Sequence, residues 1–590
     1  MKRVGMSLSY APAVPAQAGA PPGRGARSGW PRNCGPWPLW GLMALVTLLS
    51  VWPSARLLWE ALQSLGQGRA SAMWQVATEP MTWYATWNTL IVGGWGTVVA
   101  LLLGAGFALL LGLTDVRGKS VWVLAFMLPM MIPPQVTALA WLQLMGPSST
   151  LLQSLNLAPA LGTPQPLYSP AGIALLLGVQ HAPLVFLALR TQLLAIPADV
   201  AEAARLSGAS PLRVLCDVVL PLARSGWIAG GAMAFVSALG NFGIPAMLGI
   251  PVGYYTLPTL IYQKMASLGP AMLQQVAALS IWVAVLALMG VAVQMRLQAR
   301  ASYRLLGQSG RAIVWQLGRW QWVAQTGMAA VLAVILLAPL VALVASSLVP
   351  AMGVSLTPQS LTWQAYTEML SRQGVTWRAA GNSLLLSVAT AALLMALALP
   401  LAWWMARYPR PWTRAVQAVW DVPYALPGTV LAVACILLLA RPLPWVNVTL
   451  YGTLGIIFVA YLARFLVVAF KPVQASLLQL DVALEEAAQL AGAGVRQRLL
   501  HMVFPLLAPS AFAGGLLVFL TAVNELTVSA LLWSAGNETL GVLIFNYNES
   551  GDNVLASAVA VVIVVGVTVL MGAMGVLGRR LPKGVIPWSH

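Results

Sequence analysis

The sequence predicts an all-α polytopic membrane protein with about twelve transmembrane helices, arranged as two parallel repeats of one unit. Of its 590 residues, 59% are hydrophobic and only 8% are charged, whereas about a quarter of the residues in a soluble domain are charged. Apolar runs of the roughly 20 residues that cross a bilayer recur along the chain. A short polar block also occurs twice, with the same internal spacing in each copy.

The apolar runs form two sets of six. The first set lies near residues 39–60, 88–113, 120–145, 171–192, 225–248 and 272–295, and the second near 322–348, 382–406, 415–439, 451–470, 508–533 and 553–577. Proline and glycine interrupt the third and ninth runs. Backbone groups freed by such breaks are tolerated only inside a bundle or beside water. We therefore expect these two spans, with Pro133 and Pro427, to line the interface between the halves.

The positions of the basic residues predict the orientation. The net charge is +17, but the bases occur in short stretches on alternate loops, as expected when cytoplasmic loops carry the positive charge. This distribution argues against a nucleic-acid-binding surface. It predicts a basic cytoplasmic linker at 296–321, a cytoplasmic tail at 578–590 and both termini in the cytoplasm. Residues 1–38 are rich in Ala, Pro, Gly and Arg and predict a disordered cytoplasmic tail rather than a cleavable signal peptide.

The duplicated polar block sets the register of the repeat. Each copy has a glutamate, a glycine six residues later and a proline thirteen residues after that, which are Glu202, Gly208 and Pro221 in the first copy and Glu486, Gly492 and Pro505 in the second. Asn88-Thr89 also matches Asn382-Ser383, and this earlier match has a larger offset than the polar blocks have. The first half therefore has ten extra residues, which we place in the loop 146–170. An even number of spans in each half makes the repeat parallel, about an axis along the membrane normal.

The polar block predicts a helix–turn–helix in a cytoplasmic loop. Glu202-Ala203-Ala204 favours helix, and Gly208 allows a turn that a side chain would hinder. The apolar residues between 212 and 219 continue a second helical stretch, and we expect Pro221 to end it. The alternative is an amphipathic hairpin lying on the bilayer surface, but an identical spacing in two copies favours a surface for a partner.

Two ionisable residues fall within or near apolar runs. Asp421 and Glu525 are candidates for function because such groups are costly in lipid. In the register of the polar blocks, Glu525 matches Asn241, so the two positions are expected to face each other across the pseudo-axis and to line a translocation path. A hydrogen bond between helices of one half explains the same residues equally well.

The polar block resembles the EAA loop of ABC-importer permeases, and the chain from about residue 85 resembles the fused two-domain permeases of type I ABC importers, with MetI-like halves. The resemblance implies transmembrane type-1 domains at 84–295 and 380–577, each preceded by one further span and an outside loop at 39–83 and 322–379. It implies a bacterial inner-membrane location, two ATPase subunits and a periplasmic binding protein as partners. The implied coupling residues are Glu202, Ala203, Ala204, Gly208 and Pro221 in the first loop and Glu486, Ala487, Ala488, Gly492 and Pro505 in the second.

The cargo is less well defined. Four segments resemble those of ferric-iron permeases most, namely Phe242–Pro245, Gly253–Tyr262, Asn524–Thr527 and Glu538–Leu540. Thiamine and 2-aminoethylphosphonate permeases have much the same sequence in these segments. A ferric site would need oxygen ligands, and the sequence shows no cluster of carboxylates or tyrosines that would form one. We expect no cofactor and no bound metal.

Other classes of function are disfavoured. Gly118-Lys119-Ser120 is not a phosphate-binding loop, because position 113 is Leu where that motif needs Gly. The chain is therefore expected to be a transport subunit, not an enzyme, with ATP hydrolysed by a partner. A transporter driven by an ion gradient would need more intramembrane carboxylates and gives no reason for the duplicated loops. A membrane-anchored enzyme would need a catalytic cluster or a soluble domain.

Overall fold

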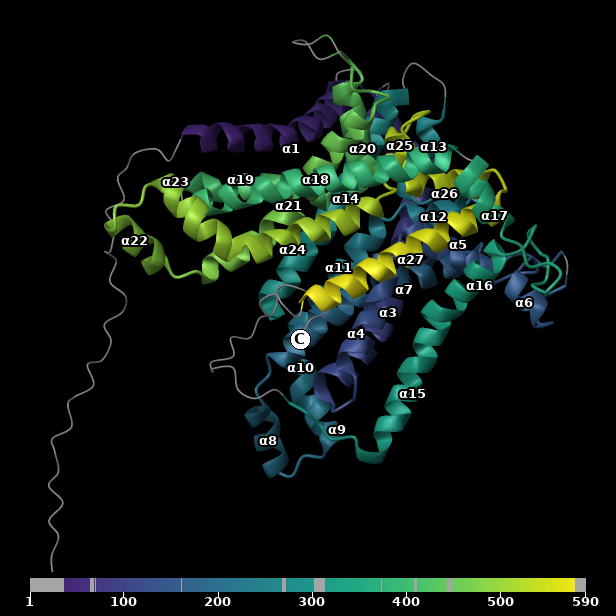
Figure 1. The fold of residues 1–590 in the computed structure, drawn as a ribbon, viewed down its shortest axis with the longest axis horizontal. Helices are drawn as coiled ribbons and strands as arrows, with labels where there is room; N and C mark the ends of the chain where they lie inside the picture. The colour runs from purple at the N-terminus through teal and green to yellow at the C-terminus, as the bar shows by residue number, and fades with distance from the viewer. Residues whose placement is uncertain are drawn as a thin grey trace, which may run out of the picture.

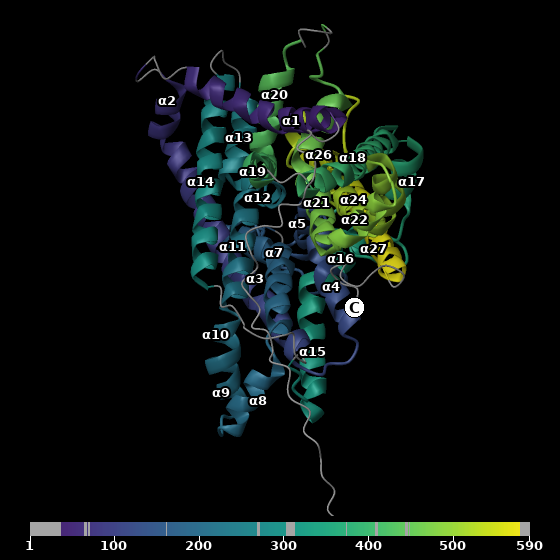
Figure 2. The ribbon, with the colours of Figure 1, turned by 90° about the vertical axis from the view of Figure 1, so that its left-hand side faces the viewer.

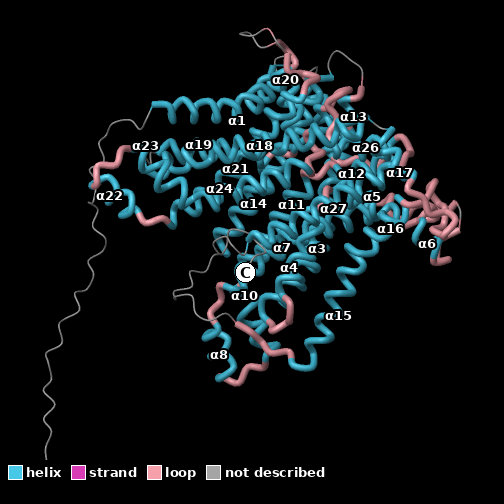
Figure 3. Tube along the Cα trace, in the orientation of Figure 1, coloured by secondary structure: helices cyan, strands magenta, loops and turns pink. Residues whose placement is uncertain are grey.

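The computed structural model describes residues 37–63, 68, 71–160, 162–267, 272–301, 313–372, 374–407, 411–442, 447 and 449–578. These residues form helices and loops without a strand, apart from one isolated bridge between Thr114 and Trp315 (Figure 3). The tail at 1–36, residues 302–312 of the basic linker and residues 579–590 lie outside the described residues.

The first half contains fourteen of the α-helices in the described chain. They are α1 (Trp37–Gln63), α2 (Ala72–Thr78), α3 (Pro80–Leu113), α4 (Lys119–Met131), α5 (Pro134–Leu144), α6 (Thr150–Ser154), α7 (Pro170–Leu194), α8 (Ala198–Leu206), α9 (Pro211–Val214), α10 (Leu220–Leu222), α11 (Arg224–Leu239), α12 (Gly243–Gly249), α13 (Leu257–Met265) and α14 (Met272–Ala301).

The second half repeats this order. Its helices are α15 (Gln321–Leu332), α16 (Ala338–Ser347), α17 (Gln364–Thr367), α18 (Gly374–Arg407), α19 (Pro411–Ala425), α20 (Gly428–Leu439), α21 (Leu454–Gln479), α22 (Val482–Leu490), α23 (Val495–Arg498), α24 (Phe504–Val523), α25 (Ser529–Leu532), α26 (Leu540–Glu549) and α27 (Asn553–Gly578). Short 3-10 turns span 250–252 and 318–320, and π-turns span 215–219, 333–337, 368–372 and 499–503.

The ends of matching helices confirm the register of the repeat. Helices α3 and α18 begin and end at the larger offset, which is that of Asn88 and Asn382, and α8 and α22 begin and end at the smaller offset of the polar blocks. The π-turns at 215–219 and 499–503 also match at the smaller offset. The offset changes between α5 and α7, where the first half contains the additional helix α6.

The predicted spans map onto helices that are long and apolar enough to cross a membrane. The described residues contain nine such helices, or up to thirteen if each sharply bent pair counts as one span. The third and ninth predicted spans are not straight, because α4 and α5 meet at 98° and α19 and α20 at 105°. Pro133 and Pro427 directly precede α5 and α20 at these bends.

Close packing within each half depends on small residues. At the crossing of α3 and α7, a Cβ built on Gly104 would lie 2.5 Å from the Ala182 carbonyl oxygen, and one built on Gly178 would lie 2.4 Å from the Val99 Cβ. Any side chain at these two positions would force the helices apart. Small residues commonly allow such contacts between membrane helices.

The two halves form two arms that diverge from a shared end (Figure 1). Helices α5, α12, α13 and α26 lie at the shared end, whereas α8 and α9 end one arm and α22 and α23 end the other. Figure 2 shows α3, α7, α11 and α14 along the first arm, with α8 and α9 below them. The two polar blocks thus lie far from the shared end.

Helices are exchanged between the halves. Helix α1 packs against α19 and α20 of the second half, and α16 packs against α5 of the first half. Met43 and Val46 of α1 are accordingly part of the second half's buried core. Each half therefore covers its bent helix pair with the leading span of the other half, and neither half has a complete core alone.

Candidate functional site

The two polar blocks fold into matching loops, which we call the first duplicated loop (residues 198–222) and the second duplicated loop (residues 482–506). Helix α8 ends in a turn at Gly208 and α22 in a turn at Gly492, and both glycines have a φ of +87°. In each loop the N–H that follows the glycine bonds to the carbonyl of the second Ala of Glu-Ala-Ala, Ala209 to Ala204 and Ala493 to Ala488, at 3.1 and 3.0 Å. The N–H of the glycine itself bonds to the carbonyl of Arg205 or Gln489, at 2.9 and 3.0 Å. A helix end with these two hydrogen bonds requires a residue in the left-handed conformation, which glycine adopts without strain.

An exposed leucine marks the same position in each duplicated loop. Leu206 is 90% exposed and Leu490 is 89% exposed. Glu202 and Glu486 are also exposed, as are Ala203 and Ala487. A single exposed leucine is common on a protein surface, but its repetition at the same place in two matching turns points to a partner. The geometry thus presents a small mixed face, with an apolar tip, at the end of each arm.

The expectation that Pro221 ends the second helical stretch is met within one residue, because the stretch Pro211–Leu222 ends at Leu222 and the chain bends by 62° into α11. At Pro505 in the second loop the chain continues as helix. Pro221 lies within α10, and Pro505 lies in the first turn of α24, which continues to Val523. A π-turn ends two residues before each of these prolines. Such a widened turn moves the carbonyl that would otherwise clash with the proline ring, so the chain remains helical.

The second duplicated loop has a buried ionic anchor. Glu485 is fully buried and accepts a hydrogen bond from Arg407 Nε at 2.8 Å, with a second contact from Arg407 Nη2, and one from Trp403 Nε1 at 3.0 Å. Glu485 lies in the first turn of α22 and Arg407 in the last turn of α18, where each charge suits its helix dipole. The matching residues of the first half are Ala201 and Leu113, both buried and apolar.

Within the described residues of the first half, the loop after α3 has no such ion pair and is instead bonded to the linker that joins the two halves. Trp315 pairs with the loop after α3, donating from its N–H to the Leu113 carbonyl at 2.7 Å and accepting from the Asp115 N–H at 3.1 Å. The Asp115 carboxylate accepts from the Leu317 N–H at 2.9 Å. The two loops therefore share a turn geometry but are attached to their arms differently.

Asn241 and Glu525 have matching structural roles. Each follows the end of a long helix, and its side-chain oxygen accepts the N–H three residues later, from Ile244 at 3.2 Å and from Val528 at 2.8 Å. Both side chains are more than nine-tenths buried. Glu525 has a further partner in its own half, since Arg464 Nε lies 3.9 Å from its carboxylate.

Contacts between the halves come from the residues directly before these two. Asn524 donates to the Met131 carbonyl at 2.6 Å, and a Cβ on Gly240 would lie 3.6 Å from Pro427. Gly240 and Pro427 line a cavity of about 260 Å³ together with Arg464. Pro133 lies at the bend that faces Asn524. Asp421 is elsewhere, in an exposed pair with Lys471 at 3.0 Å.

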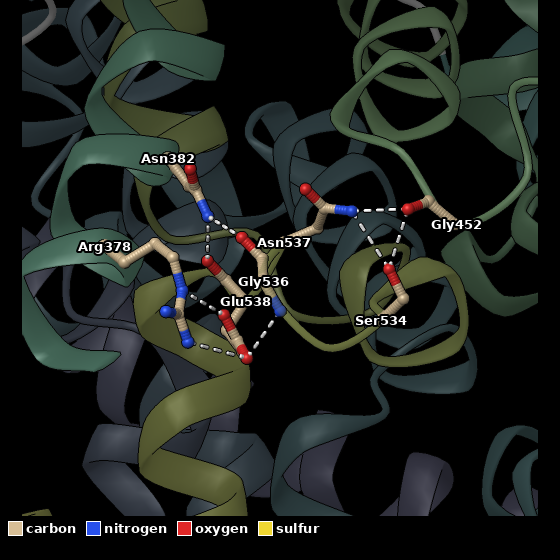
Figure 4. A network of polar contacts seen from close by, with 7 residues as sticks. All are labelled: Arg378, Asn382, Gly452, Ser534, Gly536, Asn537 and Glu538. Carbon is tan, nitrogen blue, oxygen red and sulfur yellow. Dashed lines mark hydrogen bonds and ion pairs between the residues drawn. The ribbon is translucent and has the colours of Figure 1, made fainter. Parts of the chain in front are cut away.

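A polar clamp explains the earlier anchor of the repeat, Asn88-Thr89 and Asn382-Ser383. Asn382 donates to the Gly536 and Glu538 carbonyls at 3.2 and 3.0 Å (Figure 4), and Asn88 donates to the Tyr255 carbonyl at 2.9 Å. The hydroxyls of Thr89 and Ser383 accept the first N–H groups of α13 and α26, each at 2.8 Å. The repeated Asn-Thr/Ser pair could be found in the sequence, but only the fold shows which backbone groups it binds.

The same clamp includes an ion pair in the second half. Arg378 Nε lies 3.2 Å from the Glu538 carboxylate, and the Gly536 N–H donates to that carboxylate at 2.9 Å (Figure 4). Burial acts to raise the pKa of Glu538, but these hydrogen bonds outweigh it and hold the pKa below its ordinary value. The loop between α25 and α26 is thereby fixed to α18.

Comparison with protein families matches residues 80–303 and 398–583 to the model described as "Binding-protein-dependent transport system inner membrane component". The chain belongs to this family. It is a fused, two-domain ABC-importer permease with MetI-like halves, which confirms the predicted fold class and family.

Individual relatives agree with this assignment. A probable ABC transporter permease of Sinorhizobium fredii is 27% identical over 92% of this chain and 96% of its own length. A ferric transport system permease of Actinobacillus pleuropneumoniae is 25% identical over 84% of this chain and 72% of its own length. A putative 2-aminoethylphosphonate transport permease of Salmonella typhimurium is 29% identical over 38% of this chain and 80% of its own length.

Proposed function

We propose that this permease couples ATP hydrolysis by two separate ATPase subunits to the import of cargo. The observation that supports this most is the pair of duplicated loops, which present the same glycine turn and exposed leucine at the ends of two arms. Glu202, Ala203, Ala204 and Gly208, with their counterparts Glu486, Ala487, Ala488 and Gly492, form the docking faces. Pro505 lies where the second loop passes as helix into α24, whereas the first loop bends by 62° into α11 two residues after Pro221.

The proposal includes the surroundings of the permease. It lies in the bacterial inner membrane with both termini and both duplicated loops in the cytoplasm, as the alternation of basic loops indicates. A periplasmic binding protein delivers the cargo to the shared end of the two arms. Asn241, Glu525, Pro133 and Pro427 line the path between the halves, because they lie at or beside the contacts that join them.

Ferric iron is the cargo that we propose. The ferric relative matches 84% of this chain, whereas the 2-aminoethylphosphonate relative matches 38% of it. Thiamine and 2-aminoethylphosphonate remain the alternatives within the same class.

The test is ATP-driven uptake by proteoliposomes that contain the permease together with its ATPase and binding-protein partners. Radioactive iron, supplied on the binding protein, should accumulate only when the ATPase has access to ATP. The control is an ATPase variant that binds but does not hydrolyse ATP. Uptake of thiamine or 2-aminoethylphosphonate in place of iron would overturn the cargo, and uptake without ATP hydrolysis would overturn the class.

A further inference from the structure

A polar cavity of about 510 Å³ lies between the two halves at the end of the molecule opposite the duplicated loops. Helices α5 and α12 of the first half and α26 of the second half contribute to its wall. Its polar lining residues are Gln143, Gln165, Tyr168, Asn548, Glu549 and Asn553. The lining therefore offers carboxylate, phenol and amide oxygens and, among the described residues, contains no lysine or arginine.

Two amide oxygens of this lining lack partners. Gln143 is 1% exposed, and its Oε1 has no hydrogen-bond partner among the described residues. Gln165 uses its Nε2 to bond the carbonyls of Leu142 and Met145, at 3.2 and 2.8 Å, which leaves its buried Oε1 unpaired. A buried acceptor without a donor is costly. These oxygens therefore need either a donor or a cation.

The charge of the cavity rim is negative. Glu549 has no ion-pair partner in the described part of the chain, and partial burial raises its pKa. An adjoining cavity of about 310 Å³ shares Met352 and Asn553 with the polar cavity and is lined by Glu368 and Asp552. Three carboxylates thus gather at this end of a chain whose net charge is +17.

An aromatic cluster closes the cavity towards the interior. Phe545 lines the cavity, and its ring lies 5.9 Å from that of Phe242 and 5.8 Å from that of Tyr262. Phe242 and Tyr262 are themselves 5.3 Å apart. These rings join α13 of the first half to α26 of the second half. A molecule in the polar cavity would therefore lie next to the aromatic cluster.

We propose that the polar cavity is the first cargo site on the permease and that it selects a hard cation bound through oxygen atoms. Hard cations prefer carboxylate, carbonyl and other oxygen ligands, and a rim without bases repels anions. Gln165 and Tyr168 come from the loop before α7 in the first half, whereas Glu549 and Asn553 come from the second half, so the site draws on both halves. This inference rests on the proposed function and narrows its substrate to cations, which excludes 2-aminoethylphosphonate.

The experiment uses the full-length permease alone, in lipid nanodiscs, with terbium(III) as the probe of oxygen ligands. Saturable binding is expected in the unaltered chain, with an affinity about tenfold lower in Glu549→Gln, equivalent to about 1.4 kcal/mol. Gln143→Leu should also weaken binding. The matched control is Glu79→Gln, because Glu79 already has a cationic partner in Lys264 at 2.6 Å and its loss should change nothing.

A terbium affinity that is the same in Glu549→Gln and in the unaltered chain overturns the proposed cation site. An equal loss of affinity in Glu79→Gln overturns it as well. Iron uptake with the complete transporter separates the two proposals. Normal iron uptake by Glu549→Gln and Gln143→Leu leaves the proposed function standing and overturns the cavity. Import of thiamine and not iron overturns iron as cargo and also the cavity as a cargo site, even where terbium binding depends on Glu549, because thiamine is not a hard cation.

Discussion

Glu525 caps a backbone N–H and also carries a charge that this cap does not need. Its carboxylate caps the N–H of Val528 at 2.8 Å and lies 3.9 Å from Arg464. The matching Asn241 caps Ile244 in the same way, so capping does not require a charge. The charge at position 525 is therefore in excess of what the local backbone needs, and it lies beside the residues that join the halves.

The substitution Glu525→Gln separates the two roles. The glutamine carbonyl can still cap Val528, so the variant should insert and bind the ATPase normally, but iron uptake should fall about tenfold because Arg464 loses its counter-charge. Asp421→Asn, in an exposed pair, is the control and should transport normally. A cysteine at position 525 should also react with a water-soluble thiol reagent, in a background without Cys216, which is exposed. Normal uptake by Glu525→Gln, with no labelling in any nucleotide state, would assign the residue to capping alone.

Among the elements, the two duplicated loops have the same turn, but they are anchored to the neighbouring helices by different contacts. Both place a glycine at a φ of +87°, yet only the second buries an ion pair, Glu485 with Arg407, where the first has Ala201 and Leu113. Removing one member of a buried pair leaves an uncompensated charge, whereas replacing both by apolar residues is often neutral. The first half supplies the apolar replacement.

This comparison predicts a non-additive pair of variants. Glu485→Ala and Arg407→Leu should each destabilise the protein by about 3–5 kcal/mol, and the double variant should recover most of the loss. Thermal unfolding in detergent measures the effect. Removal of the exposed Asp421–Lys471 pair is the control, with an expected cost of about 0–1 kcal/mol. A double variant destabilised by the sum of the two single effects would show that Glu485 and Arg407 are not energetically coupled.

At the scale of the whole molecule, the exchange of leading helices makes the two halves one unit. Helix α1 lies in the core of the second half, and α16 packs against α5 of the first. A single chain therefore contains both halves of the transport unit and both duplicated loops.

One chain should consequently bind two ATPase subunits. Native mass spectrometry of the detergent-purified complex measures this stoichiometry directly. Replacement of Glu-Ala-Ala in one loop at a time, together with a bulky polar residue at Leu206 or Leu490, should give complexes with a single ATPase subunit. A complex of two permease chains with one pair of ATPase subunits would contradict the prediction.

The sequence by itself determined the class, the repeat and most of the spans. The hydrophobicity of each span and the spacing of Glu202, Gly208 and Pro221 are local properties, and the structure reproduces both offsets of the repeat at the helix ends. Local reasoning located the end of the first stretch at Pro221 to within one residue, but it could not show that the chain continues as helix at the matching Pro505, because the π-turn that accommodates the ring has no residue signature in one sequence. It also missed the bends of 98° and 105°, which prolines permit but packing against the other half sets.

Only the tertiary structure decided what lies beside what. Glu485 and Arg407 are 78 residues apart, and the pairing of their charges depends on where α18 ends relative to α22. The sequence showed no cluster of oxygen ligands because Gln143, Tyr168 and Glu549 come from separate segments of both halves. Their meeting follows from the exchange of helices about the pseudo-axis, a long-range arrangement that burial of apolar surface selects and that no short stretch of sequence encodes.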